Sequence, residues 1–120
     1  MASRPRLTLR ERRALRAHVL DELIRLEETA AQLGASLAEL ELELELADIA
    51  DSERDPALVA MRDHVGALLR QTDADRIDMR STQDRIEADD FGFCEVCHEF
   101  IGVDRLLVVP TATRCTRCAT

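Results

Sequence analysis

Apolar residues in the first half of the chain recur at alternating steps of four and three. This repeat is typical of a helix that packs one face along another helix. The segment Thr8-x-x-Glu11 predicts where the helix begins, because each of these two side chains can accept a hydrogen bond from the other's backbone N–H. We therefore predict a helix over residues 9–48. Its apolar seam comprises Val19, Leu23, Leu26, Ala30, Leu33, Leu37, Leu40, Leu44 and Ala47.

Residues 39–46 alternate strictly between Glu and Leu, which by itself is the pattern of a strand. Leu and Glu are both good helix formers, whereas Glu is depleted in strands. Since the seam also continues through this segment, we interpret it as helix. Leu42 and Leu46 then lie off the seam. They are either scattered surface leucines or an apolar flank that contacts a partner.

A second helix begins at Asp55-Pro56, where Asp55 can cap the N-terminus and proline suits the first helical position. It is predicted over residues 56–89, and Gly92 stands where a C-terminal cap is expected. Three polar residues interrupt its seam, which would weaken the middle of the helix pair. The seam comprises Leu58, Met61, Val65, Leu68, Thr72, Asp75, Met79, Thr82 and Ile86.

Folding the second helix back on the first gives the predicted fold class. It is mainly α: a long antiparallel coiled-coil helical hairpin joined to a small C4 zinc-finger globule. The hairpin occupies residues 8–90 with its tip at 48–55, and the zinc finger occupies 91–120. Residues 1–7 are expected to form a mobile basic N-terminus.

The composition favours a fold that is stabilised by a helical seam and a metal site. Aromatic residues make up only 2% of the 120 residues, so few large side chains are available for a globular core. A helical seam and a metal site are common remedies in small proteins. No apolar run reaches the length of a membrane span, and residues 1–6 lead into no signal-peptide core. We therefore expect a cytoplasmic protein, in which paired cysteines bind metal more readily than they form disulfides.

The four cysteines form two Cys-x-x-Cys pairs, with seventeen residues between the second and the third cysteine. Two such pairs supply the four thiolates of a tetrahedral Zn²⁺ site. A filled shell leaves no position for water or substrate, so one structural Zn²⁺ is predicted and a catalytic zinc is not. A dithiol redox site is the weaker alternative, because no thioredoxin-like βαβ unit is visible. The predicted ligands are Cys94, Cys97, Cys115 and Cys118.

The histidines add little to this site. His98 adjoins Cys97 and is a possible substitute ligand, whereas His18 and His64 are isolated and read as ordinary surface or flank residues. The sequence also contains no Ser/His/Asp set, no phosphate-binding glycine loop and no carboxylate pair in a pocket. We therefore expect a protein that is not an enzyme.

Charge is distributed unevenly within the net −8. Residues 39–55 contain eight acids and only Arg54, so like charges crowd at the predicted tip, which costs stability. This run is either a solvated helix face or a contact surface for a basic partner, and we favour the second interpretation. The candidate partner-binding residues are Asp48, Asp51, Glu53 and Asp55.

The N-terminal segment has the opposite charge, with six Arg and one Glu in residues 1–17. These arginines could contact phosphate, form a solvated face or contact an acidic protein surface. No aromatic residues are interleaved with them, and the rest of the chain repels nucleic acid. Direct binding of nucleic acid is therefore not expected.

Taken together, the C-terminal motifs resemble the zinc finger of the DksA/TraR family. The matching residues are Asp90-Phe91-Gly92-Phe93-Cys94-x-x-Cys97, Ile101-Gly102, Arg105-Leu106, Pro110-Thr111-Ala112 and Cys115-x-x-Cys118. The resemblance implies a non-enzymatic regulator that binds bacterial RNA polymerase, with its coiled-coil tip in the secondary channel near the catalytic Mg²⁺. It also implies that the chain does not bind nucleic acid directly. Separately, we expect a monomer and, because no apolar run is long enough, no membrane contact. The alternative is a coiled-coil adaptor with a structural zinc site and a different protein partner.

The sequence departs from the family pattern at several positions. The family tip reads Asp-x-x-Asp-x-Ala; one alignment places Asp51 first, with Arg54 and Pro56 following, and another gives Asp48-x-x-Asp51 with Glu53 in place of Ala. His98 replaces the glycine that commonly follows the second cysteine. The basic residues that serve ppGpp in responsive members correspond to Asp78, Val109 and Ala119, so no ppGpp response is expected.

Overall fold

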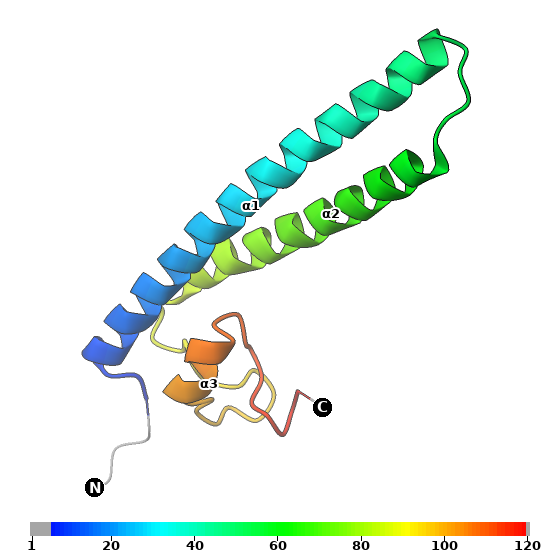
Figure 1. Cartoon of the computed structure of the whole chain (residues 1–120). Helices are drawn as coiled ribbons and strands as arrows, with labels where there is room; N and C mark the ends of the chain where they lie inside the picture. The colour runs from blue at the N-terminus through cyan, green and yellow to red at the C-terminus, as the bar shows by residue number, and fades with distance from the viewer. Residues whose placement is uncertain (1–5, 120) are drawn as a thin grey trace, which may run out of the picture. The chain divides into compact units, whose positions relative to one another are not determined.

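The structure, a computed structural model, describes residues 6–119 and consists mainly of helix (Figure 1). Two long helices, α1 (Leu9–Ile49) and α2 (Pro56–Arg85), run antiparallel, and a short helix, α3 (Val103–Val108), follows them. Residues 6–119 contain no named strand, only an isolated antiparallel bridge between Phe93 and Phe100. The predicted fold class is confirmed. No helix among these residues is long and apolar enough to cross a membrane.

The chain divides into two compact units. One comprises Ile24–Arg76, the part of the hairpin that contains the tip. The other combines the segment up to Leu23 with the segment from Ile77 onward, so it contains the base of the hairpin and the cysteine-bearing globule. Each unit is described below by itself.

Both long helices begin as the sequence predicts. At the start of α1, the backbone N–H of Thr8 donates to Glu11 Oε1 at 2.9 Å, and the N–H of Glu11 donates to Thr8 Oγ1 at 3.0 Å. At the start of α2, Asp55 Oδ1 accepts from the N–H of Ala57 at 2.9 Å. These bonds satisfy backbone donors that have no partner within the helix.

In the unit Ile24–Arg76, the predicted seam of α1 is buried or part-buried throughout. The seam of α2 needs correction, because Met61, Leu68 and Asp75 are exposed. The residues that follow them, Arg62, Leu69 and Arg76, are part-buried instead. From one starting residue, the steps along a seam can begin with three or with four, and every second seam residue then shifts by one position. Hydropathy favoured the order that begins with three, whereas the structure has the order that begins with four.

Arginine can occupy such flanking positions because its long aliphatic stem tolerates burial while the guanidinium reaches water. In this unit, Arg62 forms an ion pair with Asp63 and Arg76 forms one with Asp73, both at 3.2 Å. The correction also removes the acid that was predicted on the seam. Asp75 faces solvent and accepts a hydrogen bond from Gln71 at 2.9 Å.

In the other unit, the fully buried side chains at the base of the hairpin include Leu15, Val19, Thr82 and Ile86. Thr82 is polar, but its hydroxyl donates to the carbonyl of Asp78 at 3.0 Å and so carries no unsatisfied donor. This bond makes its burial tolerable.

The end of α2 differs from the prediction. The helix ends at Arg85 instead of about residue 89, and turns stabilised by bonds such as Ala88 N–H to Arg85 C=O (2.9 Å) follow. Gly92 therefore does not cap the helix. It has a φ of 95°, and a Cβ at this position would lie 3.2 Å from Phe100 Cε1. Glycine is needed here for both backbone conformation and close packing.

The predicted mobile N-terminus needs correction at Leu7. Residues 1–5 lie outside the described residues, but Leu7 is only 7% exposed. Its Cδ1 lies 3.6 Å from the position of a Cβ on Gly92, and Leu106 Cδ1 lies 3.5 Å from the same point. Leu7 thus packs against the cysteine-bearing globule.

Candidate metal centre and hairpin tip

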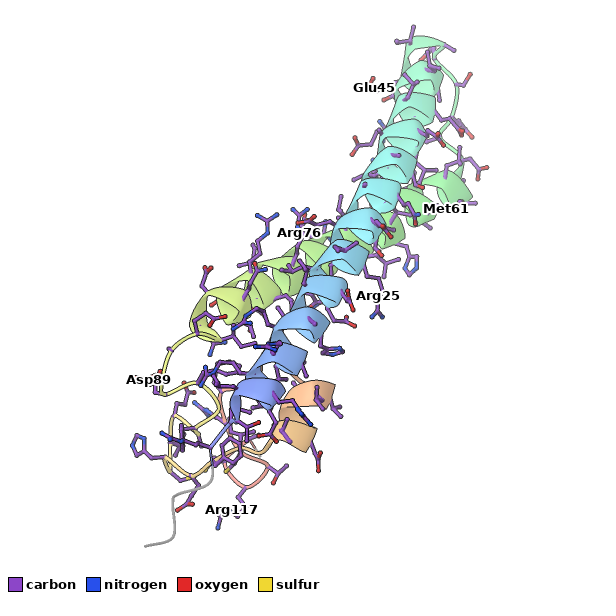
Figure 2. All side chains as sticks on the ribbon, turned by 90° about the vertical axis from the view of Figure 1, so that its left-hand side faces the viewer. Arg25, Glu45, Met61, Arg76, Asp89 and Arg117 are labelled. Carbon is purple, nitrogen blue, oxygen red and sulfur yellow. The ribbon has the colours of Figure 1, made fainter. Side chains whose placement is uncertain are left out.

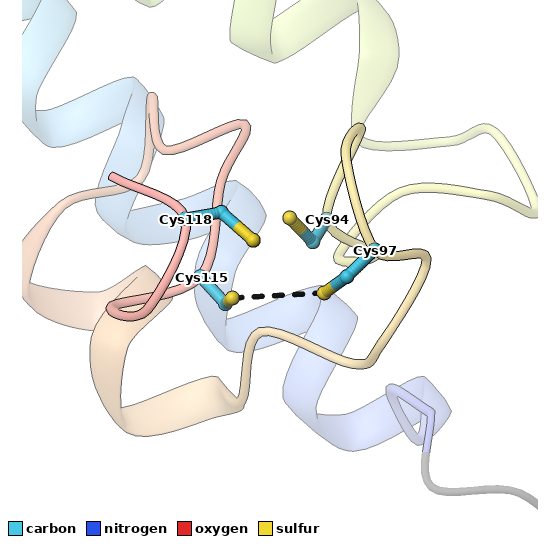
Figure 3. Close-up of side chains that lie close together, drawn as sticks. All are labelled: Cys94, Cys97, Cys115 and Cys118. Atoms are coloured by element: carbon cyan, nitrogen blue, oxygen red, sulfur yellow. Dashed lines mark hydrogen bonds between the residues drawn. The ribbon is translucent and has the colours of Figure 1, made fainter. Parts of the chain in front are cut away.

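The four cysteines, which are far apart in sequence, meet in one cluster (Figure 3). Their sulfur atoms all lie within 4.8 Å of one another, and Cys97 Sγ lies 3.7 Å from Cys115 Sγ. Four thiolates at about 2.3 Å from a tetrahedral Zn²⁺ would stand about 3.8 Å apart. The cluster therefore fits Zn²⁺, and the residues that would hold the ion are Cys94, Cys97, Cys115 and Cys118.

A tight turn presents the first pair of cysteines. The N–H of His98 donates to the carbonyl of Cys94 at 2.9 Å, and the N–H of Cys94 donates to the carbonyl of Glu99 at 2.8 Å. This turn requires the left-handed conformation at His98, where φ is 62°. Beside the turn, the rings of Phe93 and Phe100, which lie on the two segments that flank it, stand 5.8 Å apart at 56°.

A second turn presents the other pair, with the N–H of Cys118 donating to the carbonyl of Cys115 at 3.1 Å. The two turns are joined directly. The N–H of Glu95 donates to the carbonyl of Thr113 at 2.9 Å, and Arg114 Nε donates to Glu95 Oε1 at 2.8 Å. These links bring the two cysteine pairs together although seventeen residues separate them in sequence.

Backbone N–H groups at the turns favour the thiolate forms. The pKa of Cys94 is lowered to about 6, chiefly by the N–H of Cys97, and the pKa of Cys115 is lowered chiefly by the N–H of Cys118. The pKa of Cys118 is raised to about 12, chiefly by its hydrogen bond with Cys115. Four such close sulfurs need a cation to become thiolates together, and a metal ion held there would supply that charge.

None of the histidines joins this cluster. His98 is exposed, and the candidate metal group found among residues 6–119 contains cysteines only. His98 instead contributes its backbone conformation. His18 is part-buried and His64 is exposed, as expected for ordinary flank or surface residues.

At the tip, the four predicted partner-binding acids are all exposed, but they differ in what they bind. Arg54 donates to both carboxylate oxygens of Asp48, at 2.9 and 2.5 Å, and this contact lowers the pKa of Asp48. Asp55 caps α2. Asp51 has a φ of 55° just past the end of α1, and Glu53 follows it in the loop.

The arginines near the N-terminus include two with partners in the same unit. Arg12 donates to the backbone carbonyls of Ile86 and, at 3.1 Å, Ala88, just beyond the end of α2. Arg16 forms a two-point ion pair with Glu87, at 2.5 and 2.9 Å, which lowers the pKa of Glu87. Sequence reasoning missed these roles. Their partners are more than seventy residues away, and no local signal marks them.

The C-terminal globule resembles a known protein family. Residues 89–120 match the family described as "Prokaryotic dksA/traR C4-type zinc finger". The chain is also 40% identical over 70 residues to the RNA polymerase-binding transcription factor DksA of Haemophilus influenzae. This match covers 55% of the chain and 48% of that protein, so the chain aligns with about half the length of this curated relative.

A solved structure shares the fold. The structure of transcription factor DksA2 from Pseudomonas aeruginosa superposes with a TM-score of 0.76 and 21% sequence identity. The superposition covers 92% of this chain and 81% of that one. At this identity the likeness concerns the fold alone.

Proposed function

We propose that this chain, whose residues 89–120 match the prokaryotic dksA/traR C4-type zinc-finger family, is a non-enzymatic bacterial transcription regulator that binds RNA polymerase. The observation that carries the proposal is the 40% identity over 70 residues to a factor named for binding RNA polymerase. The fold shared with the Pseudomonas aeruginosa structure supports only the architecture that the proposal requires, a helical hairpin with a small globule.

In this proposal, the hairpin tip enters the secondary channel of the polymerase. The support is the crowding of exposed acids on the end of α1 and the loop that follows it, with eight acids against one arginine in residues 39–55. Asp51 and Glu53 offer exposed carboxylates there, whereas Asp48 is paired with Arg54. We propose Asp48, Asp51, Glu53 and Asp55 as the contact set, with Asp51 and Glu53 most available to a partner.

The zinc site has a structural role in this proposal. One Zn²⁺ bound by four thiolates has no open position for chemistry, so it stabilises the globule at the base of the hairpin. The regulator would act as a cytoplasmic monomer, without contacting nucleic acid or membrane. It would not respond to ppGpp through Asp78, Val109 and Ala119, because none of these three exposed residues is basic.

The test uses the zinc-loaded full chain and bacterial core RNA polymerase. We expect binding at micromolar concentration or tighter, and displacement by another factor that occupies the secondary channel. The double variant Asp48→Asn/Asp51→Asn should reduce the effect on transcription more than the binding. Asn tolerates the left-handed backbone of residue 51, so the turn is retained. Asp21→Asn, an exposed acid on α1, is the matched control. Absence of binding at micromolar concentration would refute the proposal.

A second candidate is a coiled-coil adaptor with a different protein partner. It is favoured by Leu42 and Leu46, which are both 55% exposed. Replacing both with Lys should abolish binding of such a partner and leave polymerase binding dependent on the tip acids. If polymerase binding depends on the leucines and not on the acids, the channel proposal fails.

A further inference from the structure

Within the unit Ile24–Arg76, helix α1 is apolar on two opposite faces. The first face is the buried seam that contains Leu37, Leu40 and Leu44. At 3.6 residues per turn, a second apolar row lies about 180° away from it. We call this the outer row; it comprises Ala31, Ala35, Ala38, Leu42, Leu46 and Ile49.

All six residues of the outer row are exposed. Leu42 and Leu46 are each 55% exposed and Ile49 is 81% exposed. A helix with one packing partner normally carries polar residues on the face away from that partner. The Glu-Leu alternation of residues 39–46 contributes Leu42 and Leu46 to the second row, because it places leucines on both sides of the helix. The row has the spacing that packs against another helix, and its alanines leave room for a close approach.

Glutamates flank the outer row on both sides. Glu39 and Glu43 lie on one side and Glu41 and Glu45 on the other, each roughly 60–100° around the helix from the row's centre. All four are exposed, and Glu45 is labelled in Figure 2. A second copy of the chain would set these carboxylates against its own. Such repulsion opposes self-association, whereas a basic partner would be attracted.

We propose that the outer row is a docking surface for an amphipathic helix of another protein whose apolar stripe is flanked by Lys or Arg. The apolar residues of that helix pack on Leu42, Leu46 and Ile49. Its basic side chains pair with the flanking glutamates, as charged residues beside a coiled-coil seam do. This surface shares no residue with the contact set proposed for RNA polymerase, because it uses Leu42, Leu46, Ile49 and the glutamates of α1 and none of Asp48, Asp51, Glu53 and Asp55.

The test uses the zinc-loaded full chain and a dye-labelled synthetic helix of about three heptads, with Leu and Ala in its stripe and Lys beside it. Fluorescence anisotropy should show binding in the micromolar range. A peptide with Glu in place of Lys should bind at least tenfold more weakly. Added salt should weaken the binding of the Lys peptide, because exposed charges are screened.

Variants localise the binding. The triple variant Leu42→Ser/Leu46→Ser/Ile49→Ser should bind the Lys peptide at least tenfold more weakly. Its helix content should persist, because these side chains are exposed. Met61→Ser is the matched control, since Met61 is 53% exposed on α2. It should bind like the original chain.

Two results would overturn the proposal. The first is equal binding by the triple variant, or by a Lys peptide whose stripe is replaced with Ser, since attraction would then be electrostatic only. The second is a dimer in sedimentation that the triple variant abolishes, because a second copy would then occupy the row.

Discussion

Arg12 stabilises the end of α2, although it lies more than seventy residues away in sequence. Its guanidinium donates to the carbonyl of Ile86 in a part-buried contact and to the carbonyl of Ala88 in an exposed one. Both carbonyls follow the last residue of the helix, where backbone acceptors lose their regular partners and a positive charge also suits the helix dipole. Replacing Arg12 with Ala removes both bonds.

The cost follows from these two contacts. A hydrogen bond from a charged group contributes about 1.5–3 kcal/mol, and the exposed bond contributes less because water can replace it. Arg12→Ala should therefore destabilise the fold by about 2–3 kcal/mol. Since urea lowers the free energy of unfolding of small proteins by about 1–3 kcal/mol per molar, the unfolding midpoint should fall by about 1 M.

The measurement is urea unfolding with excess zinc, followed by far-ultraviolet circular dichroism. Arg13→Ala is the matched control, because Arg13 is an exposed neighbour on the same helix. It should change stability by less than about 0.5 kcal/mol. Arg12→Lys should recover part of the loss, since an ammonium can reach one carbonyl but lacks the planar fork. If Arg12→Ala costs no more than Arg13→Ala, the capping role is refuted.

Three further predictions concern the zinc finger and the tip. His98→Gly should tighten zinc binding about fivefold in a chelator competition, because a left-handed residue other than glycine costs about 1 kcal/mol; an equal gain from His98→Ala would contradict this reason. Metal analysis should return one Zn²⁺ per chain. Chelation should unfold residues 91–118 in nuclear magnetic resonance spectra, and Cys94→Ser should cause the same unfolding. The pKa of Asp48 should lie below its usual value and return to it in Arg54→Ala. The Asp48–Arg54 contact is thus complete above the usual pKa and is lost only as the pH falls through the lowered one; an unchanged titration in Arg54→Ala would exclude the ion pair.

Local signals were sufficient for much of the fold. The capping residues at Thr8 and Asp55 begin the two long helices where predicted, because these bonds involve residues two or three positions apart. The spacing of the cysteines likewise indicated a single cluster, and the four sulfurs meet. Hydropathy failed on α2, where Arg62 and Arg76 are part-buried while Met61 and Leu68 are exposed. An arginine stem counts as polar in a sequence pattern but packs like a hydrocarbon.

The tip shows a similar division between local and spatial information. The sequence identifies the acids but cannot rank them, because their availability depends on which partners the loop brings near. Only the folded loop pairs Asp48 with Arg54 and leaves Asp51 in the left-handed region. The partner-binding role of these residues stays a prediction.

The sequence by itself determined the helical class, the helix starts, the cysteine cluster and the acidic character of the tip. These features depend on side chains close in sequence or on a spacing that chemistry restricts. Only the tertiary structure decided that Arg12 caps α2, that Leu7 packs beside Gly92, and that α1 carries a second apolar face without a partner in its unit. Each of these depends on which distant segments meet, and that is set by packing of the whole unit and not by any local pattern.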